Sequence, residues 1–146
     1  MSAAASSLRG MASVVSQLTI DSADPHALAL WWREVLGWSY AWEPSDDDDE
    51  VEIGPPDGGT TNWLFLKVPD VKTTKNRLHV DLRPPNGSDQ ATELERLLGL
   101  GATRVDIGQG DVPWHVLADP EGNEFCLLRG TPDQAAAAMA AEASGS

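Results

Sequence analysis

An internal repeat constrains the fold of this chain more than any other feature of its sequence. Residues 18–21 (LTID) resemble residues 78–81 (LHVD), which lie 60 positions later, and residues 63–67 (WLFLK) resemble residues 125–129 (FCLLR), 62 positions later. A repeat of this length is typical of duplicated structural modules that stabilise one another by packing. The sequence therefore predicts two similar modules in tandem.

The first module, residues 14–70, begins with a strand at 16–21, where apolar and polar side chains alternate. A helix follows, because Asp24 is a good N-cap, Pro25 suits the first helical position, and apolar residues then recur at helical spacing. Gly37 is expected to end this helix.

The second module, residues 76–130, repeats the same order. Its first strand is expected at 77–82, and Ser88 or Asp89 can cap the helix that follows. The remaining strands of the two modules are expected at 38–42, 51–53, 62–68, 102–106, 114–118 and 124–128. The predicted fold is α+β: two tandem βαβββ modules with curved sheets that enclose a cleft, and with the helices outside.

Composition and the chain ends narrow the class of protein. Residues 1–13 read as a disordered leader and residues 131–146 as a flexible Ala-rich tail around one domain, 14–130. Because the 23 acidic and 10 basic residues give a net charge of −13, binding to nucleic acid is not expected. No apolar run is long enough to span a membrane, and the single cysteine, Cys126, excludes an internal disulfide, so we expect a cytoplasmic protein.

Two motifs resemble those of a known superfamily. Residues 19–25 (TIDSADP) with 31–38 (WWREVLGW), and 119–125 (DPEGNEF) near the end of the second module, look like the vicinal oxygen chelate superfamily. This superfamily includes glyoxalase I, extradiol dioxygenases, fosfomycin-resistance enzymes and bleomycin-resistance proteins. The resemblance is closest to its small glyoxalase-like domain members and covers residues 14–130. It implies a fold with a cleft, on which several chemistries occur.

The resemblance also implies where a metal would bind. Catalytic members similar to glyoxalase I hold a divalent ion with one side chain from the first and one from the last strand of each module. Those positions correspond here to Gln17, Leu64, Arg77 and Cys126. Leu64 and Arg77 cannot ligate a metal, so we expect no bound metal or other cofactor, with a divalent ion as the alternative.

A second layer of polar residues lies two positions away on the same strand faces: Thr19, Asn62, His79 and Glu124. If the first and last strands of a module run antiparallel, His79 and Glu124 lie side by side. Such a pair can be half of a metal site, an acid–base dyad or a structural hydrogen bond. The tentative catalytic residues are therefore His79 and Glu124.

Other polar and aromatic residues are expected to contact a ligand in the cleft. These are Gln17, Thr19, Asn62, Arg77, Trp114 and Cys126. Arg77 can bind a carboxylate ligand or form a salt bridge, and Trp114 can stack on a ligand or pack in the core. Cys126 is also compatible with a buried, unreactive thiol.

The function expected from this sequence is small-molecule binding without the usual divalent metal site, as the resemblance to bleomycin-resistance proteins implies. The acidic surface and six tryptophans suit a cationic, aromatic ligand. The alternative is a lyase, isomerase or dioxygenase that uses His79 and Glu124, with or without a metal. Enzymatic activity thus stays open, and a homodimer is expected from the resemblance.

Overall fold

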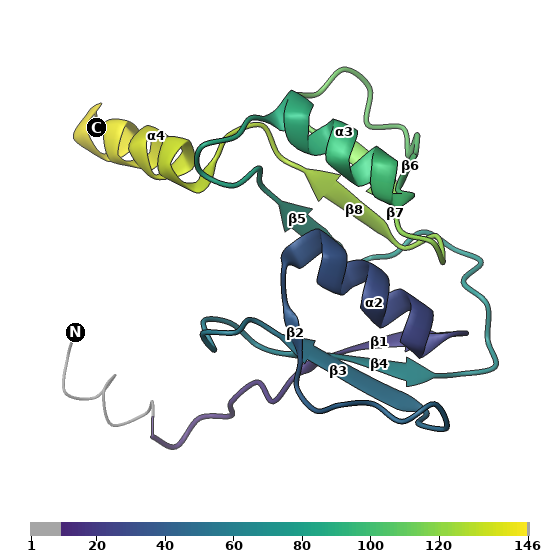
Figure 1. Ribbon diagram of the computed structural model, residues 1–146. Coiled ribbons are helices and arrows are strands. Elements are labelled where there is room, and N and C mark those ends of the chain that lie inside the picture. Colours follow the sequence, from purple (N-terminus) through teal and green to yellow (C-terminus); the bar gives the residue numbers. More distant parts are fainter. Residues whose placement is uncertain (1–9, 146) are drawn as a thin grey trace. The chain divides into compact units, whose positions relative to one another are not determined.

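The computed structural model describes residues 10–145, which form two compact units that divide between Val68 and Pro69. Each unit holds one four-stranded sheet and one helix that lies along it (Figure 1). The α+β class and the twofold βαβββ order predicted from the sequence are confirmed. The cleft expected between the modules stays a prediction, and residues 1–9 of the expected leader lie outside the described residues.

The first unit follows the predicted order closely. Its elements are β1 (Leu18–Ser22), α2 (Pro25–Leu36), β2 (Ser39–Tyr40), β3 (Glu50–Gly54) and β4 (Trp63–Lys67). The strands lie in the order β1-β4-β3-β2. The inner strand β4 lies between β1 and β3 and has a nearly continuous apolar sequence.

Local sequence signals set both ends of α2. The Asp24 carboxylate accepts a hydrogen bond from the backbone N–H of Ala27 at 3.2 Å, which satisfies a donor that the first helical turn leaves free. Gly37 closes the helix with a φ of 66°, a conformation that glycine adopts without strain. The buried side of α2 packs on the sheet, where the rings of Trp32 and Trp63 meet edge to face at 5.2 Å.

The second unit repeats this arrangement and adds a helix at its end. Its elements are β5 (Val80–Leu82), α3 (Gln90–Leu100), β6 (Thr103–Arg104), β7 (His115–Ala118), β8 (Glu124–Leu127) and α4 (Pro132–Gly145). Asp89 rather than Ser88 caps α3, because its carboxylate accepts from the backbone N–H of Thr92 at 2.8 Å. The tail forms the helix α4, none of whose residues is buried. Within residues 10–145, no helix is long and apolar enough to cross a membrane.

The first and last strands of each unit run parallel, and not antiparallel as the sequence analysis assumed. β1 pairs with β4, and β5 pairs with β8, both in parallel. The direction follows from the order of elements. A helix returns the chain so that the next strand repeats the direction of the first, and two antiparallel hairpins then reverse it twice.

Strand pairing also corrects the internal alignment of the two modules. Leu18 pairs with Trp63 and Val80 pairs with Phe125, so both strands of the pair are displaced by 62 positions between modules. The sequence similarity had placed the first strand at a displacement of 60. A slip of two residues keeps every side chain on its original face, so the alternation of polar and apolar residues does not detect it.

The two faces of the second sheet differ in character. Phe125 and Leu127 correspond to Trp63 and Phe65, which lie on the face that α2 covers in the first unit. They are almost completely buried and form the core on the helix side. Asp81, Cys126 and Val116 are register partners across β5, β8 and β7, so they lie side by side on the opposite face. That opposite face holds the candidate site.

Candidate functional site

His79, Asp81 and Cys126 form a close group of three potential ligand side chains in the described part of the chain. His79 immediately precedes β5, Asp81 lies in the middle of that strand, and Cys126 is the register partner of Asp81 on β8. One ligand atom from each side chain lies within 4.8 Å of those of the other two. His79 Nδ1 is 3.3 Å from Asp81 Oδ1. The side chains of His79 and Asp81 are 42% and 49% exposed, whereas Cys126 is only 6% exposed.

The surroundings of Cys126 favour its neutral thiol. Burial raises the pKa of the thiol, and the charge of Asp81 and a hydrogen bond to that carboxylate raise it further, while Lys75 opposes the shift. A thiol of this kind is a poor nucleophile by itself. Cys126 is buried, as one interpretation in the sequence analysis expected, and it lies beside two exposed polar groups. Its reactivity stays a prediction.

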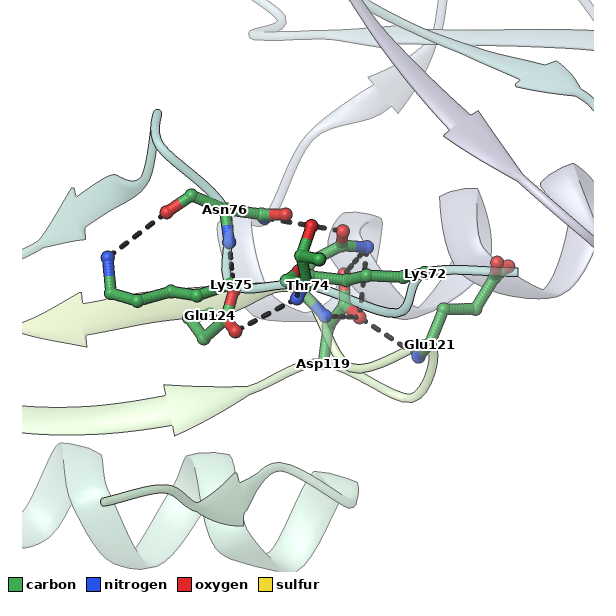
Figure 2. Close-up of polar contacts among 8 residues, drawn as sticks. Lys72, Thr74, Lys75, Asn76, Asp119, Glu121 and Glu124 are labelled. Atoms are coloured by element: carbon green, nitrogen blue, oxygen red, sulfur yellow. Dashed lines mark hydrogen bonds and ion pairs between the residues drawn. The ribbon is translucent and has the colours of Figure 1, made fainter. Parts of the chain in front are cut away.

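Glu124 is bound to the segment that precedes β5. Its carboxylate contacts the Lys72 ammonium at 2.9 Å and accepts the backbone N–H of Asn76 at 3.0 Å (Figure 2). Burial acts to raise the pKa of Glu124, but the hydrogen bonds from Asn76 and Lys72 outweigh it, so the pKa lies below its ordinary value. Glu124 stays ionised at neutral pH and holds residues 72–76 against the start of β8.

The turn before β8 keeps Glu124 and Cys126 in place. The buried Asp119 carboxylate accepts the backbone N–H of Glu121 at 2.9 Å (Figure 2). It also accepts the backbone N–H of Asn123 at 3.0 Å. Asn123 in turn accepts from the Asn76 side-chain amide at 3.4 Å. Gly122, with a φ of 86°, supplies the left-handed residue of this turn. The DPEGN motif thus acts as a rigid start for β8.

The structure does not form the direct pair of His79 and Glu124 that the antiparallel assumption implied. His79 contacts Asp81, whereas Glu124 contacts Lys72 and Asn76. Residues 79 and 124 do lie at the same level of the sheet, because their following neighbours Val80 and Phe125 are partners. Because β5 and β8 are parallel, both residues lie at the same end of the sheet. There, Lys72 and Asn76 of the segment before β5 contact Glu124.

Asp81, Lys72 and Asn76 are the residues that the sequence analysis missed. The signal for Asp81 was present, since a residue two positions after His79 on a strand faces the same way. Recognising it required the parallel register with Cys126. Lys72 and Asn76 lie in an irregular segment, for which the sequence has no periodic signal.

Three expected ligand contacts belong to the first unit. Gln17 and Thr19 are exposed at β1, and the Gln17 amide oxygen accepts from the Ser16 hydroxyl. Asn62 is half-buried just before β4, and its amide donates to the Glu52 carboxylate at 3.0 Å. These residues give the first unit a polar edge, and their part in binding a ligand stays a prediction.

The other two expected contacts of the second unit are exposed. Arg77 lies in a bend before β5, and not on the strand as predicted, because β5 begins only at Val80. Trp114 precedes β7 and is 38% exposed, so part of its indole is available for stacking.

One open depression lies in the first unit, beside the acidic turn formed by residues 45–49 (SDDDD). It is lined by Trp42, Asp48, Asp49, Glu50, Leu66 and Lys67. Trp42 is 42% exposed, unlike the helix tryptophans Trp31 and Trp32, which are buried.

The match to a protein family agrees with this architecture. The sequence profile of the glyoxalase-like domain family matches residues 17–128. The chain belongs to this family. The matched region of the glyoxalase-like domain contains both sheets, the helices α2 and α3 and all the candidate residues described above. A search of curated proteins found no match.

Solved structures resemble the fold of this glyoxalase-like domain. The fosfomycin-resistance protein FosX of Mesorhizobium loti is 15% identical, with a TM-score of 0.60, and the match covers 87% of this chain and 99% of that one. A glyoxalase/bleomycin resistance/dioxygenase family enzyme of Burkholderia phytofirmans is 16% identical, with a TM-score of 0.58, and the match covers 79% and 97%. A FosX mutant of Listeria monocytogenes, with Mn(II) and 1S,2S-dihydroxypropylphosphonic acid, is 17% identical, with a TM-score of 0.59, over 85% and 95%.

The corrected register changes the argument about a metal. A displacement of 62 makes His79, and not Arg77, the counterpart of Gln17. The four positions that the superfamily resemblance implied therefore become Gln17, Leu64, His79 and Cys126. Leu64 still cannot ligate, but imidazole and thiolate are both good ligands for divalent ions. With Asp81 beside them, the donor atoms of the second unit fit a divalent metal.

Proposed function

We propose that this glyoxalase-like protein binds a small molecule on the face of the second sheet that carries Asp81 and Cys126. One observation carries the proposal: the exposed pair of His79 and Asp81 lies beside a buried floor made by Cys126 and Val116. A few polar groups above an apolar floor are the usual composition of a small-molecule site. The side chains of Cys126 and Val116 provide apolar contact area. The side chains of His79 and Asp81 provide directional hydrogen bonds.

The likeness to FosX supports a small ligand without identifying it, because at this level of identity only the fold is shared. The electrostatics near the site are mixed. Asp81 attracts cations, while Lys75 is close enough for its charge to act on the Cys126 thiol. We therefore propose a small polar molecule, with the cationic aromatic ligand expected from the sequence as one class to test.

Ligand-observed NMR with the full chain tests the proposal. Three sets of probes are screened: aromatic amines, hydroxycarboxylic acids and small phosphonic acids. The site variant combines His79→Ala with Asp81→Asn. The matched control combines His115→Ala with Asp111→Asn, which changes the same residue types elsewhere in the second unit. We expect at least one set to bind the wild type and the control, and to lose its signal with the site variant. Equal binding to both variants, or no binding to the wild type, would contradict the proposal.

A metal-dependent lyase, isomerase or dioxygenase is the second candidate, and the donor cluster favours it. His79, Asp81 and Cys126 would hold the ion, which supplies polarisation of substrate oxygens when bound. The role of Glu124 in this candidate differs from the catalytic role expected from the sequence. Because Lys72 and Asn76 hold this carboxylate ionised, it fixes the neighbouring segment and does not donate a proton.

Turnover assays distinguish binding from catalysis. Each probe that binds in the NMR screen is incubated with the protein, with and without added zinc, cobalt or manganese, and its spectrum is followed over hours. New resonances that require both the protein and His79 would establish an enzyme. An unchanged spectrum under all conditions would leave a binding protein.

The homodimer expected from the superfamily resemblance also remains a proposal. Sedimentation velocity of the full chain over a hundredfold range of concentration measures it. A single species of twice the chain mass of 15.6 kDa is the expected result, and a monomer at all concentrations would contradict it.

A further inference from the structure

We infer that the open depression in the first unit is a binding site for a small organic ammonium ion, one whose charged nitrogen carries alkyl groups. None of its six lining residues belongs to the site proposed on the second sheet. The inference therefore goes beyond the proposed function.

Backbone pairing forms the walls of the depression. Glu50 is the first residue of β3 and the register partner of Leu66 on β4. The backbone N–H of Lys67 donates to the carbonyl of Asp49 at 2.8 Å, which joins the acidic turn to the end of β4. The depression has a volume of about 510 Å³, within the range of about 300–1,000 Å³ that is typical of small-molecule sites.

Trp42 and Leu66 give the depression its apolar surface. The backbone N–H of Ala41 donates to the carbonyl of Glu52 at 2.8 Å, so the segment that leads to Trp42 lies beside β3. Trp42 is 42% exposed, and within residues 10–145 no other aromatic ring packs against it. Indole is the side chain that attracts cations most strongly through its ring face, so Trp42 can bind an alkylated ammonium group.

Carboxylates line the rest of the depression. The Asp48 carboxylate accepts the backbone N–H of Ser45 at 2.7 Å, which holds the acidic turn in shape. In the described part of the chain, the carboxylates of Asp49 and Glu50 accept no hydrogen bond and form no ion pair, and Lys67 forms none with them. Three carboxylates and one ammonium group give the lining a net charge of −2. The depression therefore favours a cation over a neutral or anionic ligand.

The mixture of an indole, a leucine and carboxylates selects the kind of cation. Magnesium and calcium are held by oxygen ligands and gain nothing from an apolar wall. An alkylated ammonium ion uses both parts of the lining. Its alkyl groups contact Trp42 and Leu66, while its charge is attracted by the ring face and by the carboxylates of Asp49 and Glu50.

Two probes of the same shape and different charge test the inference. Choline carries a trimethylammonium group, and 3,3-dimethyl-1-butanol has an uncharged carbon atom in place of the nitrogen. Each is titrated into the full chain, and the indole N–H signals of the tryptophans are followed by two-dimensional NMR. We expect choline to shift the Trp42 signal saturably, and the alcohol to bind at least tenfold more weakly, because it lacks the attraction of a cation to the ring and the carboxylates.

Variants of the tryptophan test the aromatic contact, with affinity measured from the methyl signal of choline. Trp42→Leu should weaken choline binding at least fivefold, and Trp42→Phe should recover part of the loss, since a phenyl ring also attracts cations. The control Trp114→Leu changes an exposed tryptophan of the second unit and should bind within twofold of wild type.

Variants of the acidic turn and of β3 test the charge. Asp49→Asn combined with Glu50→Gln should weaken choline binding at least fivefold. The matched control combines Asp46→Asn with Asp47→Asn, which removes the same charge from exposed positions of the same turn that do not line the depression. This control should bind within twofold of wild type. Circular dichroism confirms that each variant is folded; if Trp42→Leu does not fold, the two carboxylate variants decide.

Four results would overturn the inference: no saturable shift in the wild type, equal affinity for choline and the alcohol, wild-type affinity in Trp42→Leu, or equal losses in the two carboxylate variants. The variant with His79→Ala and Asp81→Asn leaves the depression intact, so it should bind choline as the wild type does. Loss of choline binding in that variant would place the ion on the second sheet and also overturn the inference. Failure of this inference is therefore distinguishable from failure of the proposed function.

Discussion

Lys72 and Glu124 form an ion pair with 2.9 Å between Nζ and Oε1, across 52 positions of the sequence. Their side chains are only 20% and 11% exposed. The pair ties the segment before β5 to the first residue of β8, and the backbone N–H of Asn76 completes the binding of the carboxylate. These contacts join the segment that leads to His79 to the start of β8.

Replacement of Glu124 by Gln should lower the free energy of unfolding at pH 7 by about 1–2 kcal/mol, because the ion pair is lost while one hydrogen bond can persist. The pKa of Glu124 is lowered by folding, so its stabilisation is fully present above the unfolded pKa and is lost as the pH falls through the folded pKa. The difference between wild type and variant should therefore shrink below about pH 4. Urea unfolding at several pH values measures it, with the exposed Glu95→Gln as control. A difference that stays constant down to pH 2 would contradict the assignment.

The cap of α2 provides a second prediction. Asp24→Ala should destabilise the protein by about 1 kcal/mol, because the backbone N–H of Ala27 loses its acceptor. Asp24→Asn should retain most of the stability, since an amide oxygen can also accept. Thermal unfolding measures both variants against Asp47→Ala, an exposed change in the acidic turn. Equal losses for Ala and Asn would show that charge and not capping is responsible.

The helix α4 is predicted to contribute little to stability beyond its first residues. No residue of α4 is buried, but Gln134 accepts the backbone N–H of Thr131, and Thr131 is buried. Deletion of residues 135–146 should leave the melting temperature nearly unchanged. A drop of more than about 5 °C, roughly 1 kcal/mol for a chain of this size, would mean that α4 packs on another part of the protein.

The thiol of Cys126 should react slowly in the folded protein without metal. It is 6% exposed, so an aromatic disulfide reagent reaches it only when β8 opens locally. We expect labelling in buffer to be at least tenfold slower than in concentrated urea, where the thiol is fully accessible. Labelling at equal rates in both conditions would mean that β8 is not stably paired.

Much of the fold was predictable because its signals are local. The cap at Asp24, the terminating Gly37 and the apolar spacing between them determine α2 almost to the residue. The duplicated order of elements likewise followed from the similarity between residues 63–67 and 125–129. These features depend on residues that are near one another in the chain, so they can be predicted from the sequence.

The candidate site was only partly predictable, because it depends on pairing between distant strands. The sequence identified His79, Glu124 and Cys126 as polar or reactive groups on the first and last strands of the second module. Strand direction and a two-residue shift of register then decided that His79 meets Asp81 and that Glu124 meets Lys72. Alternation of side chains is unchanged by such a shift, so periodicity gives the face of a strand but not its level. Only the backbone hydrogen bonds between β5 and β8 fix that level, and with it the composition of the site.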